Sequence, residues 1–289
     1  MRIAVTGGSG LVGRAIIRRL TERHDVVNID LSDPGRARAE HSLDREAPSV
    51  RYAATDILDI AGLSRAIDGA QAVVHAAAIP GPAFGSESDI REVNVQGTRN
   101  VALAVGRANV RRIVFISSES VLGFAFSEGR VKPDYLPVDE AHPLAPTDAY
   151  GRSKLDAEIV LARRAEKTAT VISLRPPWVW VPEEYEKLRR LTVAPGNWSG
   201  GLWAYVHGDD LARAVERAVT LEIGPGFHAA YVAAPDNGTI VPTARLLEEY
   251  FPDVPVRKDL PEFGSLVSSS RLEELLGFTP SMSWREFLR

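Results

Sequence analysis

The stretch that decides the fold lies at the start of the chain and reads Ile3-Ala4-Val5-Thr6-Gly7-Gly8-Ser9-Gly10-Leu11-Val12-Gly13. An apolar run comes first and an amphipathic segment follows, so the glycines fall where a strand would turn into a helix. At such a junction Gly7 permits the tight turn, Gly10 lets a pyrophosphate approach the backbone, and Gly13 lets the helix pack closely. The stretch predicts a dinucleotide-binding turn whose helix N-terminus faces the phosphates; a tight turn without a ligand is the alternative.

An acidic residue follows at the distance that a dinucleotide-binding turn requires. Asp30 ends the next apolar run about twenty residues after the glycines, where a carboxylate would bind the ribose hydroxyls of NAD. The same carboxylate would repel the extra phosphate of NADP, although Arg36 and Arg38 lie nearby and keep NADP open. NAD is therefore the expected cofactor; a solvated carboxylate at a strand end is the alternative interpretation of Asp30.

Short apolar runs alternate with amphipathic segments as far as residue 175. The runs are rich in valine and isoleucine, as buried parallel strands are, and the alternation is typical of a doubly wound sheet with right-handed crossovers. We therefore predict an α/β fold over residues 1–175, with a Rossmann-type parallel sheet. The expected strands span residues 2–6, 26–30, 50–54, 72–75, 112–117 and 170–175, and the expected helices span residues 11–22, 60–67, 88–108 and 149–166.

The pattern loosens over residues 176–289, where prolines and a glycine-rich stretch at 196–201 interrupt it. We predict a small substrate-covering lobe here, without an independent core, whose segment near 204–221 returns to the first domain. The expected strands lie near residues 204–207 and 227–233, and the expected helices span residues 209–221, 243–250, 270–276 and 284–288.

Composition excludes several classes of function. The net charge of −4 argues against binding to nucleic acid or to an anionic membrane. The chain contains no cysteine, which excludes disulfides and cysteine nucleophiles, and its six histidines show no metal-ligand spacing, so we predict no metal site. No apolar run approaches the length of a membrane span, and Gly7 interrupts any signal peptide. We expect a cytoplasmic protein.

The segment Tyr150-Gly151-Arg152-Ser153-Lys154 places a phenol and an ammonium group one helical turn apart on the same face. A tyrosine that acts as a general base at neutral pH needs its pKa lowered by roughly three units from 10, which takes roughly 4 kcal/mol. A neighbouring lysine and a cationic nicotinamide ring would supply this by opposite-charge stabilisation. Ser118, directly after an expected strand, would hold the substrate oxygen beside Tyr150. The alternative is a surface tyrosine and a solvated lysine.

The glycine turn, the serine and the Tyr-x-x-x-Lys segment, in this order, resemble the extended short-chain dehydrogenase/reductases, the NAD-dependent epimerase/dehydratase family. The resemblance covers nearly the whole chain. Further matching segments are Asp56-Ile57, His75-Ala76-Ala77-Ala78, Asn94-Val95-Gln96-Gly97-Thr98, Leu174-Arg175-Pro176, Tyr205-Val206-His207-Gly208-Asp209-Asp210 and Leu276-Gly277-Phe278.

The resemblance implies roles for individual residues. Tyr150 would be the general base or acid, Ser118 would hold the reacting oxygen, and Lys154 would bind the nicotinamide ribose and tune Tyr150. Asn94 would brace its helix or a water molecule, and His207 would fix a loop. The residues expected to contact the cofactor are Gly7, Ser9, Gly10, Leu11, Val12, Gly13, Asp30, Asp56, Ile57, Ala76, Ala77, Ala78, Asn94, Ile116, Tyr150, Lys154 and Pro176. Those expected to face the substrate are Pro80, Ser118, Glu119, Ser120, Trp178, Arg190 and Trp203.

The chain departs from the nucleotide-sugar members of this family at two positions. By the resemblance, UDP-galactose 4-epimerases carry an asparagine where Trp178 stands and an arginine where Trp203 stands. The stretch between Pro182 and Trp203 is shorter than the nucleotide-binding insert that the family usually has there. Tryptophans suit a smaller substrate, because sugar rings and apolar groups stack on indoles, although they are equally consistent with core packing. Arg175, and Arg189 or Arg190, would bind a carboxylate. The layout resembles uronate dehydrogenases.

The leading hypothesis is NAD-dependent hydride transfer at a hydroxyl-bearing carbon of a sugar or sugar acid. An NAD-dependent UDP-sugar 4-epimerase is the main alternative, and a non-catalytic dinucleotide sensor, which would not need Tyr150, Lys154 and Ser118 together, is a minor one. By resemblance, the helices at 88–108 and 149–166 would pair in a four-helix bundle and form a homodimer.

Overall fold

A parallel sheet of seven strands runs through the computed structural model, which describes residues 1–32, 50–127, 131–165 and 169–287. The strand order is β3-β2-β1-β4-β5-β6-β9, so the sheet grows in one direction from β1 and in the other from β4. Such a reversal opens a crevice at the carboxyl ends of the two strands. The bounds are β1 Arg2–Thr6, β2 Asp25–Asp30, β3 Val50–Ala54, β4 Ala72–His75, β5 Arg112–Ile116, β6 Thr170–Arg175 and β9 Gly226–Tyr231.

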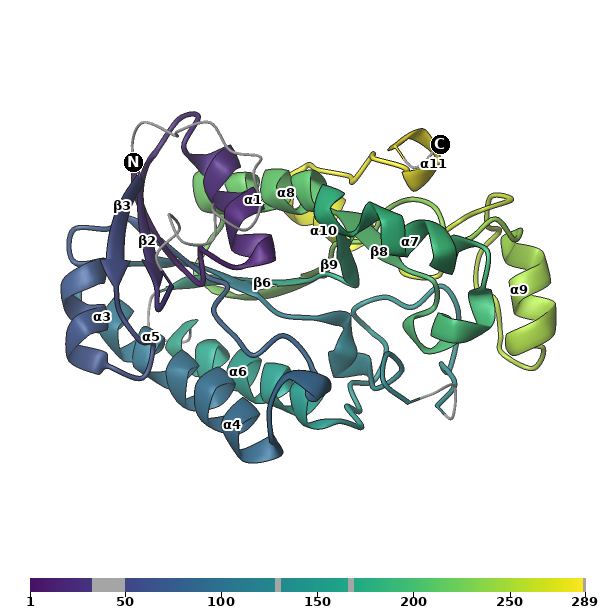
Figure 1. Cartoon of the computed structure of the whole chain (residues 1–289), viewed down its shortest axis with the longest axis horizontal. Helices are drawn as coiled ribbons and strands as arrows, with labels where there is room; N and C mark the ends of the chain where they lie inside the picture. The colour runs from purple at the N-terminus through teal and green to yellow at the C-terminus, as the bar shows by residue number, and fades with distance from the viewer. Residues whose placement is uncertain (33–49, 128–130, 166–168, 288–289) are drawn as a thin grey trace.

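Helices cover both faces of the sheet (Figure 1). Helices α1 (Leu11–Leu20) and α8 (Gly208–Thr220) pack together on one face. Helices α3 (Ile60–Ile67), α5 (Gly97–Arg107) and α6 (Ala149–Ala165) lie on the other. The predicted doubly wound α/β fold is confirmed.

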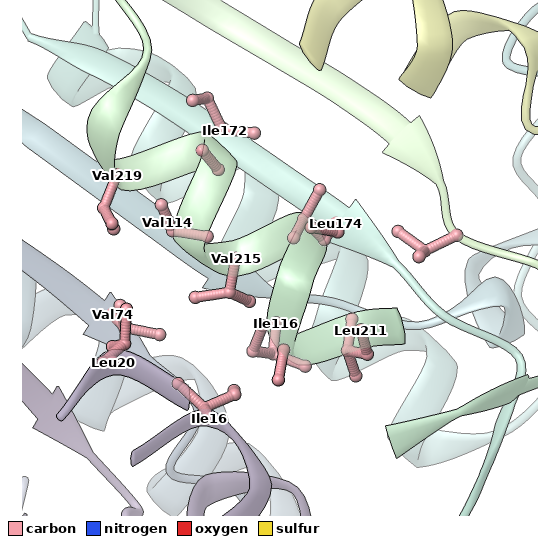
Figure 2. Close-up of a cluster of buried hydrophobic side chains, with 14 of the residues drawn as sticks. Ile16, Leu20, Val74, Val114, Ile116, Ile172, Leu174, Leu211, Val215 and Val219 are labelled. Atoms are coloured by element: carbon pink, nitrogen blue, oxygen red, sulfur yellow. The ribbon is translucent and has the colours of Figure 1, made fainter. Parts of the chain in front are cut away.

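Aliphatic side chains fill the space between the sheet and the α1–α8 layer (Figure 2). Burying such chains supplies roughly 1.5–3 kcal/mol for each large one. The sequence pattern therefore decides this layer, because the valine-rich strands have apolar side chains on both faces. The labelled residues are Ile16 and Leu20 from α1, Val74 from β4, Val114 and Ile116 from β5, Ile172 and Leu174 from β6, and Leu211, Val215 and Val219 from α8.

The helix expected over residues 88–108 is interrupted once. It begins as α4 (Glu87–Arg91), passes through a π-helical turn at Glu92–Gln96, and continues as α5. A single π turn inserts one residue into the helix and is frequent at functional sites. Asn94, one of the predicted site residues, lies in this turn.

The lobe is built differently from its sequence-based prediction. Strand β8 (Tyr205–His207) pairs with the unpredicted strand β7 (Trp178–Trp180), and α7 (Tyr185–Thr192) was not predicted either. Helix α8 and strand β9 belong to the main sheet and its covering layer, so the boundary at 175 assigns β9 to the wrong part. The predicted helices α9 (Thr243–Tyr250), α10 (Ser270–Leu276) and α11 (Trp284–Phe287) are present.

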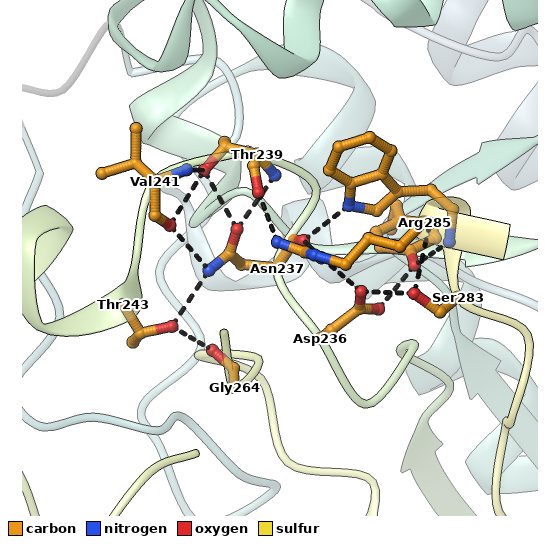
Figure 3. A network of polar contacts seen from close by, with 10 residues as sticks. Asp236, Asn237, Thr239, Val241, Thr243, Gly264, Ser283 and Arg285 are labelled. Carbon is orange, nitrogen blue, oxygen red and sulfur yellow. Dashed lines mark hydrogen bonds and ion pairs between the residues drawn. The ribbon is translucent and has the colours of Figure 1, made fainter. Parts of the chain in front are cut away.

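Polar contacts hold the loops of the lobe together (Figure 3). Arg285 donates to the Asp236 carboxylate and, at 3.0 Å, to the carbonyl of Asn237. The Asn237 amide group in turn donates to Thr243 Oγ1 at 3.0 Å and accepts from the backbone of Thr239 at 2.9 Å. The segment before α9 is therefore fixed by a residue near the end of the described chain. Within the described ranges, no helix is long and apolar enough to cross a membrane; a cytoplasmic location stays a prediction.

Candidate active site

The glycine turn joins β1 to α1 at the crevice between β1 and β4. Gly7 has φ +72°, and a β-carbon there would lie 2.5 Å from the backbone nitrogen of Ala77. A side chain is therefore excluded, and the ends of the two strands come close together. At Gly10, a β-carbon would meet only the Gly7 carbonyl, at 3.3 Å, and α1 begins there without a side-chain cap or an acidic residue in its first turn. This cradle fits the pyrophosphate of a dinucleotide, because backbone N–H groups at a helix N-terminus attract anions.

Asp30 stands beside this turn, at the end of β2. Its carboxylate accepts hydrogen bonds from the backbone N–H groups of Ser9, at 3.0 Å, and Ser32, at 3.1 Å. The carboxylate is thus oriented next to the turn, where it fits the ribose hydroxyls of a dinucleotide. Arg36 and Arg38 lie outside the described residues.

The remaining predicted cofactor residues occupy neighbouring strand ends. Ala76, Ala77 and Ala78 follow β4 and are partly buried, with Ala77 against Gly7. Asp56 follows β3 and accepts from the Leu58 backbone at 2.8 Å, while Ile57 packs against Gly97 of α5. These residues lie at the carboxyl end of the sheet. Their contacts with the cofactor stay predictions. The other predicted cofactor residues are Ser9, Leu11, Val12 and Gly13 in the turn and first turn of α1, Ile116 at the end of β5, and Pro176 after β6.

Tyr150 and Ser118 meet because α6 approaches the segment after β5 closely. A β-carbon at Gly151 would lie 2.6 Å from the Ser120 carbonyl oxygen, so only glycine allows this approach. The Ser118 hydroxyl lies close enough to the Tyr150 phenol to lower its pKa, and it accepts a hydrogen bond from the Ser120 backbone at 3.1 Å. The serine is therefore held beside the phenol.

Lys154 lies one turn along α6 and points to the end of β5. Its ammonium group donates to the Ile116 carbonyl at 2.8 Å and lies 5.6 Å from the centre of the Tyr150 ring. Burial lowers the pKa of Lys154 to about 7, although the nearby Glu158 carboxylate acts in the opposite direction. The predicted trio of Ser118, Tyr150 and Lys154 is thus brought together.

The protein alone does not lower the pKa of Tyr150, contrary to the expectation. Burial raises this pKa to about 12, with Ser118 acting to lower it and Asp148 to raise it. Lys154 is bound to a backbone carbonyl, and its own pKa is already lowered, so it contributes less positive charge than expected. A phenolate at Tyr150 would therefore need most of its stabilisation from another positive charge, such as a cationic nicotinamide ring.

Asn94 acts as a brace in this structure. Its side chain accepts from the Ile79 backbone at 2.7 Å and donates to the Ile79 carbonyl at 3.1 Å. It also donates to Ser153 Oγ at 2.9 Å, and Ser153 in turn donates to the Tyr150 carbonyl at 2.7 Å. The π turn is therefore tied to α6, which favours the bracing role predicted for Asn94.

The segment after β5 contains several buried polar groups. Ser117 Oγ and Ser120 Oγ are buried without a hydrogen-bond partner among the described residues. Glu119 is 9% exposed, its carboxyl lies near Gly201, and burial raises its pKa well above the usual value. Buried polar groups without partners call for a ligand or water, so Ser117 joins Glu119 and Ser120 as a candidate. Its signal in the sequence was its place beside Ser118.

Two arginines and two tryptophans were predicted to lie near the substrate, and the structure buries one of each and leaves the other at least partly exposed. Trp203 has no exposed surface and donates to the Pro195 carbonyl at 2.8 Å, so it is a core residue. Arg175 is also buried, and its guanidinium group binds both oxygens of the Glu158 carboxylate, at 2.9 and 2.7 Å, so this side of the group is already occupied. Arg190 is exposed on α7 and pairs with Glu186. Trp178 remains partly exposed beside Trp198.

Of three further residues, two were named from the sequence and one was not. Pro80 is exposed after β4. His207 caps α8 by accepting from the Asp209 backbone at 3.1 Å, which agrees with the loop-fixing role expected for it. Phe126 was missed: its ring lies edge-on to Tyr150, with centroids 6.2 Å apart. It comes from a loop without periodicity, so no pattern in the sequence points to it.

Comparisons with known proteins agree with this geometry. Residues 3–196 match the NAD dependent epimerase/dehydratase family. The chain is 29% identical over 218 residues to L-arabinose 1-dehydrogenase (NAD(P)(+)) of Haloferax volcanii, a match that covers 70% of this chain and 80% of the relative.

Solved structures share the fold along the whole chain. A UDP-galactose 4-epimerase is 25% identical with a TM-score of 0.71, and the match covers 100% of this chain and 96% of the epimerase. A mutated uronate dehydrogenase is 21% identical with a TM-score of 0.69, covering 99% and 85%, and it supports the fold alone. Several structures of this fold were determined with NAD bound. The chain therefore belongs to the NAD-dependent epimerase/dehydratase family and is an enzyme whose cofactor is NAD.

Proposed function

We propose that this enzyme transfers a hydride between NAD and a hydroxyl-bearing carbon of a sugar or sugar acid, with Tyr150 as the general base or acid. The observation that carries the proposal is the meeting of Tyr150, Ser118 and Lys154 at the carboxyl end of the sheet, beside the dinucleotide turn. Bound NAD supplies the hydride acceptor and a positive charge near the phenol.

The chain's own groups divide the remaining work. Ser118 holds the substrate oxygen next to Tyr150, which takes the hydroxyl proton during oxidation and returns it during reduction. Lys154 binds the nicotinamide ribose. Lys154 is buried and Tyr150 is partly buried, so both groups lie partly out of water, which strengthens these interactions in the crevice.

On the substrate side, we propose that Ser118, Glu119 and Ser120 bind hydroxyl groups next to the reacting carbon. Burial raises the pKa of Glu119 well above its usual value, so the carboxyl group stays protonated and can both donate and accept hydrogen bonds. Trp178 offers a partly exposed indole for stacking. Pro80 and Arg190 stay substrate-facing proposals, at the exposed rim.

A free sugar or sugar acid is proposed ahead of a nucleotide sugar. The similarity to an L-arabinose 1-dehydrogenase supports it, and so does a tryptophan at 178, where UDP-galactose 4-epimerases by resemblance carry an asparagine. The match to a UDP-galactose 4-epimerase over the full chain favours the second candidate, a UDP-sugar 4-epimerase.

The experiment that tests the proposal follows NADH absorbance when NAD is added with free aldoses, uronic acids and UDP-sugars in turn. We expect NADH to accumulate with a free sugar or a uronate. Epimerised UDP-sugar without net NADH would instead establish the epimerase, because the same bound cofactor would have returned the hydride.

Replacing Tyr150 by phenylalanine tests the chemistry itself. Tyr150→Phe keeps the ring but removes the proton carrier, and we expect turnover to fall by about a thousandfold, as for other general acid–base groups. NAD affinity, measured by calorimetry, should stay unchanged. Tyr250→Phe, at a tyrosine that packs on Trp203, is the matched control and should retain activity. Normal turnover in Tyr150→Phe would exclude Tyr150 as the base.

We also propose that the enzyme forms a homodimer through α5 and α6, with residues 88–108 and 149–166 in a four-helix bundle. Leu103 on α5 is 56% exposed and Ile159 on α6 is 46% exposed, and both aliphatic side chains would lose that exposed surface in such a bundle. We expect twice the chain mass at micromolar concentration by light scattering, and a monomer for the double variant Leu103→Arg/Ile159→Arg. A monomeric wild type would contradict the proposal.

A further inference from the structure

A row of hydrogen bonds passes through the buried imidazole of His75, behind the cofactor turn. His75 Nδ1 lies 2.7 Å from Thr6 Oγ1, and Nε2 lies 2.9 Å from Thr98 Oγ1. At one end, the Ala77 N–H points to Thr6 Oγ1 at 3.4 Å; at the other, Thr98 Oγ1 lies 2.5 Å from the Asn94 carbonyl oxygen. The three side chains in the middle have no exposed surface.

The two ends of the row fix the direction of every hydrogen bond in it. The Asn94 carbonyl can only accept, so the Thr98 hydroxyl donates to it and accepts from His75 Nε2–H. The Ala77 N–H can only donate, so Thr6 Oγ1 accepts from it and uses its own proton for His75 Nδ1. The imidazole is therefore the neutral tautomer with its proton on Nε2.

The surroundings keep this imidazole neutral. Burial, and to a lesser degree the positive charge of Lys154, lowers the pKa of His75 to about 3. The ring stacks on Phe115, with centroids 5.4 Å apart, and the Lys154 ammonium group lies 5.0 Å from the centre of the Phe115 ring. A protonated imidazole would turn Nδ1 into a donor and break the bond from Thr6.

The row connects the two parts of the site that have to be aligned for catalysis. Thr6 directly precedes Gly7 of the cofactor turn. Ala77 follows β4 and lies against Gly7, where the chain after β1 and the chain after β4 come close together. Asn94, at the far end, holds Ser153 on α6, and Ser153 donates to the carbonyl of Tyr150. One set of directed bonds thus runs from the cofactor turn to the helix that carries the catalytic tyrosine.

We propose that His75 is a positioning residue that fixes the cofactor turn and the catalytic helix relative to each other through this single row of hydrogen bonds. It touches neither the substrate oxygen nor Tyr150. The proposal depends on NAD binding, which the family assigns, and not on the identity of the substrate. It therefore stands or falls separately from the proposed sugar oxidation.

A double-mutant cycle on NAD affinity tests whether the row acts as one unit. Thr6→Val and Thr98→Val keep the size and branching of the side chain, and each removes one hydroxyl group with its two hydrogen bonds in the row. We expect the NAD dissociation constant, measured by calorimetry, to rise about tenfold in each variant and by the same factor in the double variant, because coupled groups are not additive. A rise of about a hundredfold in the double variant, or unchanged affinity in both single variants, would overturn the proposal.

A second pair of variants tests the role of the imidazole. Glutamine carries one donor and one acceptor with a spacing similar to that of neutral histidine, so His75→Gln should keep the NAD affinity within about twofold of wild type, well under the tenfold that corresponds to 1.4 kcal/mol. His75→Leu, which fills the space without polar atoms, should lose affinity as the threonine variants do. Equal losses in both would assign His75 to packing alone. Should the leucine variant fail to fold, the threonine cycle still decides.

Nitrogen NMR of the imidazole supplies a readout that a packing role would not produce. We expect the His75 signals, assigned by their absence in His75→Gln, to show the Nε2–H tautomer and to remain unprotonated from pH 8 to pH 5. In Thr98→Val, the Nε2–H signal should shift because its acceptor is gone. A tautomer with the proton on Nδ1, or a titration near the ordinary pKa of 6.5, would contradict the row as assigned.

Discussion

The sheet and the lobe beside it both bury aliphatic side chains, but the lobe also buries large aromatic ones. Aliphatic clusters fill both faces of the sheet, whereas the clusters of the lobe contain Trp180, Trp203 and Tyr205, and its loops are joined by polar contacts such as Arg285 with Asp236. Aliphatic packing is non-directional and supplies most of the free energy of folding. The polar groups buried in the sheet, such as His75 and Glu158, are thus available to orient the site.

The lobe shows the opposite division of roles. Its segment before α9 makes few regular backbone ladders, and side chains supply the missing partners, as Asn237 does for Thr239. Hydrogen bonds of this kind hold one conformation but contribute only about 1 kcal/mol each. The difference teaches that polar residues orient the proposed catalytic groups in one region and fix the path of the chain in the other.

The largest expected difference between the two regions is the loss of stability of the sheet region at low pH. The folded-state pKa of His75 is lowered from 6.5 to about 3, so its unfolded form binds a proton first as the pH falls. Stability is therefore fully present above pH 6.5 and is lost as the pH falls towards 3, by about 5 kcal/mol. Denaturant titrations at several pH values measure this. His75→Gln keeps the hydrogen bonds but does not titrate, so its free energy of unfolding should lack that part of the pH dependence. Parallel curves of stability against pH for the wild type and the variant would contradict this prediction.

A buried ion pair gives the next largest contrast. Glu158 on α6 and Arg175 on β6 are almost completely buried and bonded through both carboxylate oxygens. Glu158→Gln leaves the arginine charge without its partner, and we expect a loss of about 4 kcal/mol in the free energy of unfolding. It should also lower the pKa of Lys154 further, because the Glu158 carboxylate now raises it.

The matched change in the lobe is Asp236→Asn. Asp236 and Arg285 are partly exposed, and asparagine keeps a hydrogen-bond acceptor, so we expect a loss of only about 1 kcal/mol. Chemical denaturation of both variants gives the two values. A larger loss for Asp236→Asn than for Glu158→Gln would mean that the lobe, and not the sheet, limits stability.

The last contrast concerns the cofactor pocket, where the expected effect is on ligand affinity and not on stability. Asp30→Ala removes the carboxylate that would bind the ribose hydroxyls, and we expect NAD affinity to fall about tenfold, or about 1.4 kcal/mol. NADP affinity should fall less, because a repulsion is removed with it. Asp30→Asn, which still accepts from the Ser9 backbone, separates the loss of charge from the loss of that bond. Equal losses for NAD and NADP would refute the proposed role of Asp30.

Local patterns predicted most of the sheet half. Strands β1, β3, β4 and β6 have the expected bounds, and β2 differs by one residue. The reason is that a buried parallel strand has a composition that is visible in five residues. The π turn at Glu92–Gln96 was not visible, because the residues on either side of it have ordinary helical periodicity.

The lobe could not be predicted to the same extent. Strand β7 has only three residues, Trp178–Trp180, and pairs with β8 some twenty-five residues later. Strand β9 was expected near its place, but nothing local shows that it completes the main sheet beside β6. Such pairings depend on which surfaces meet in the folded chain.

By itself, the sequence determined the parallel sheet, the glycine turn and the types of residue proposed to carry the chemistry, because these depend on backbone sterics and on spacing within one segment. The tertiary structure alone decided the environment of each group. It buried Tyr150 enough to raise its pKa, bound Lys154 to a carbonyl, and used Arg175 for Glu158. Burial and partners across strands set the free energy of a charge, and neither is written in neighbouring residues.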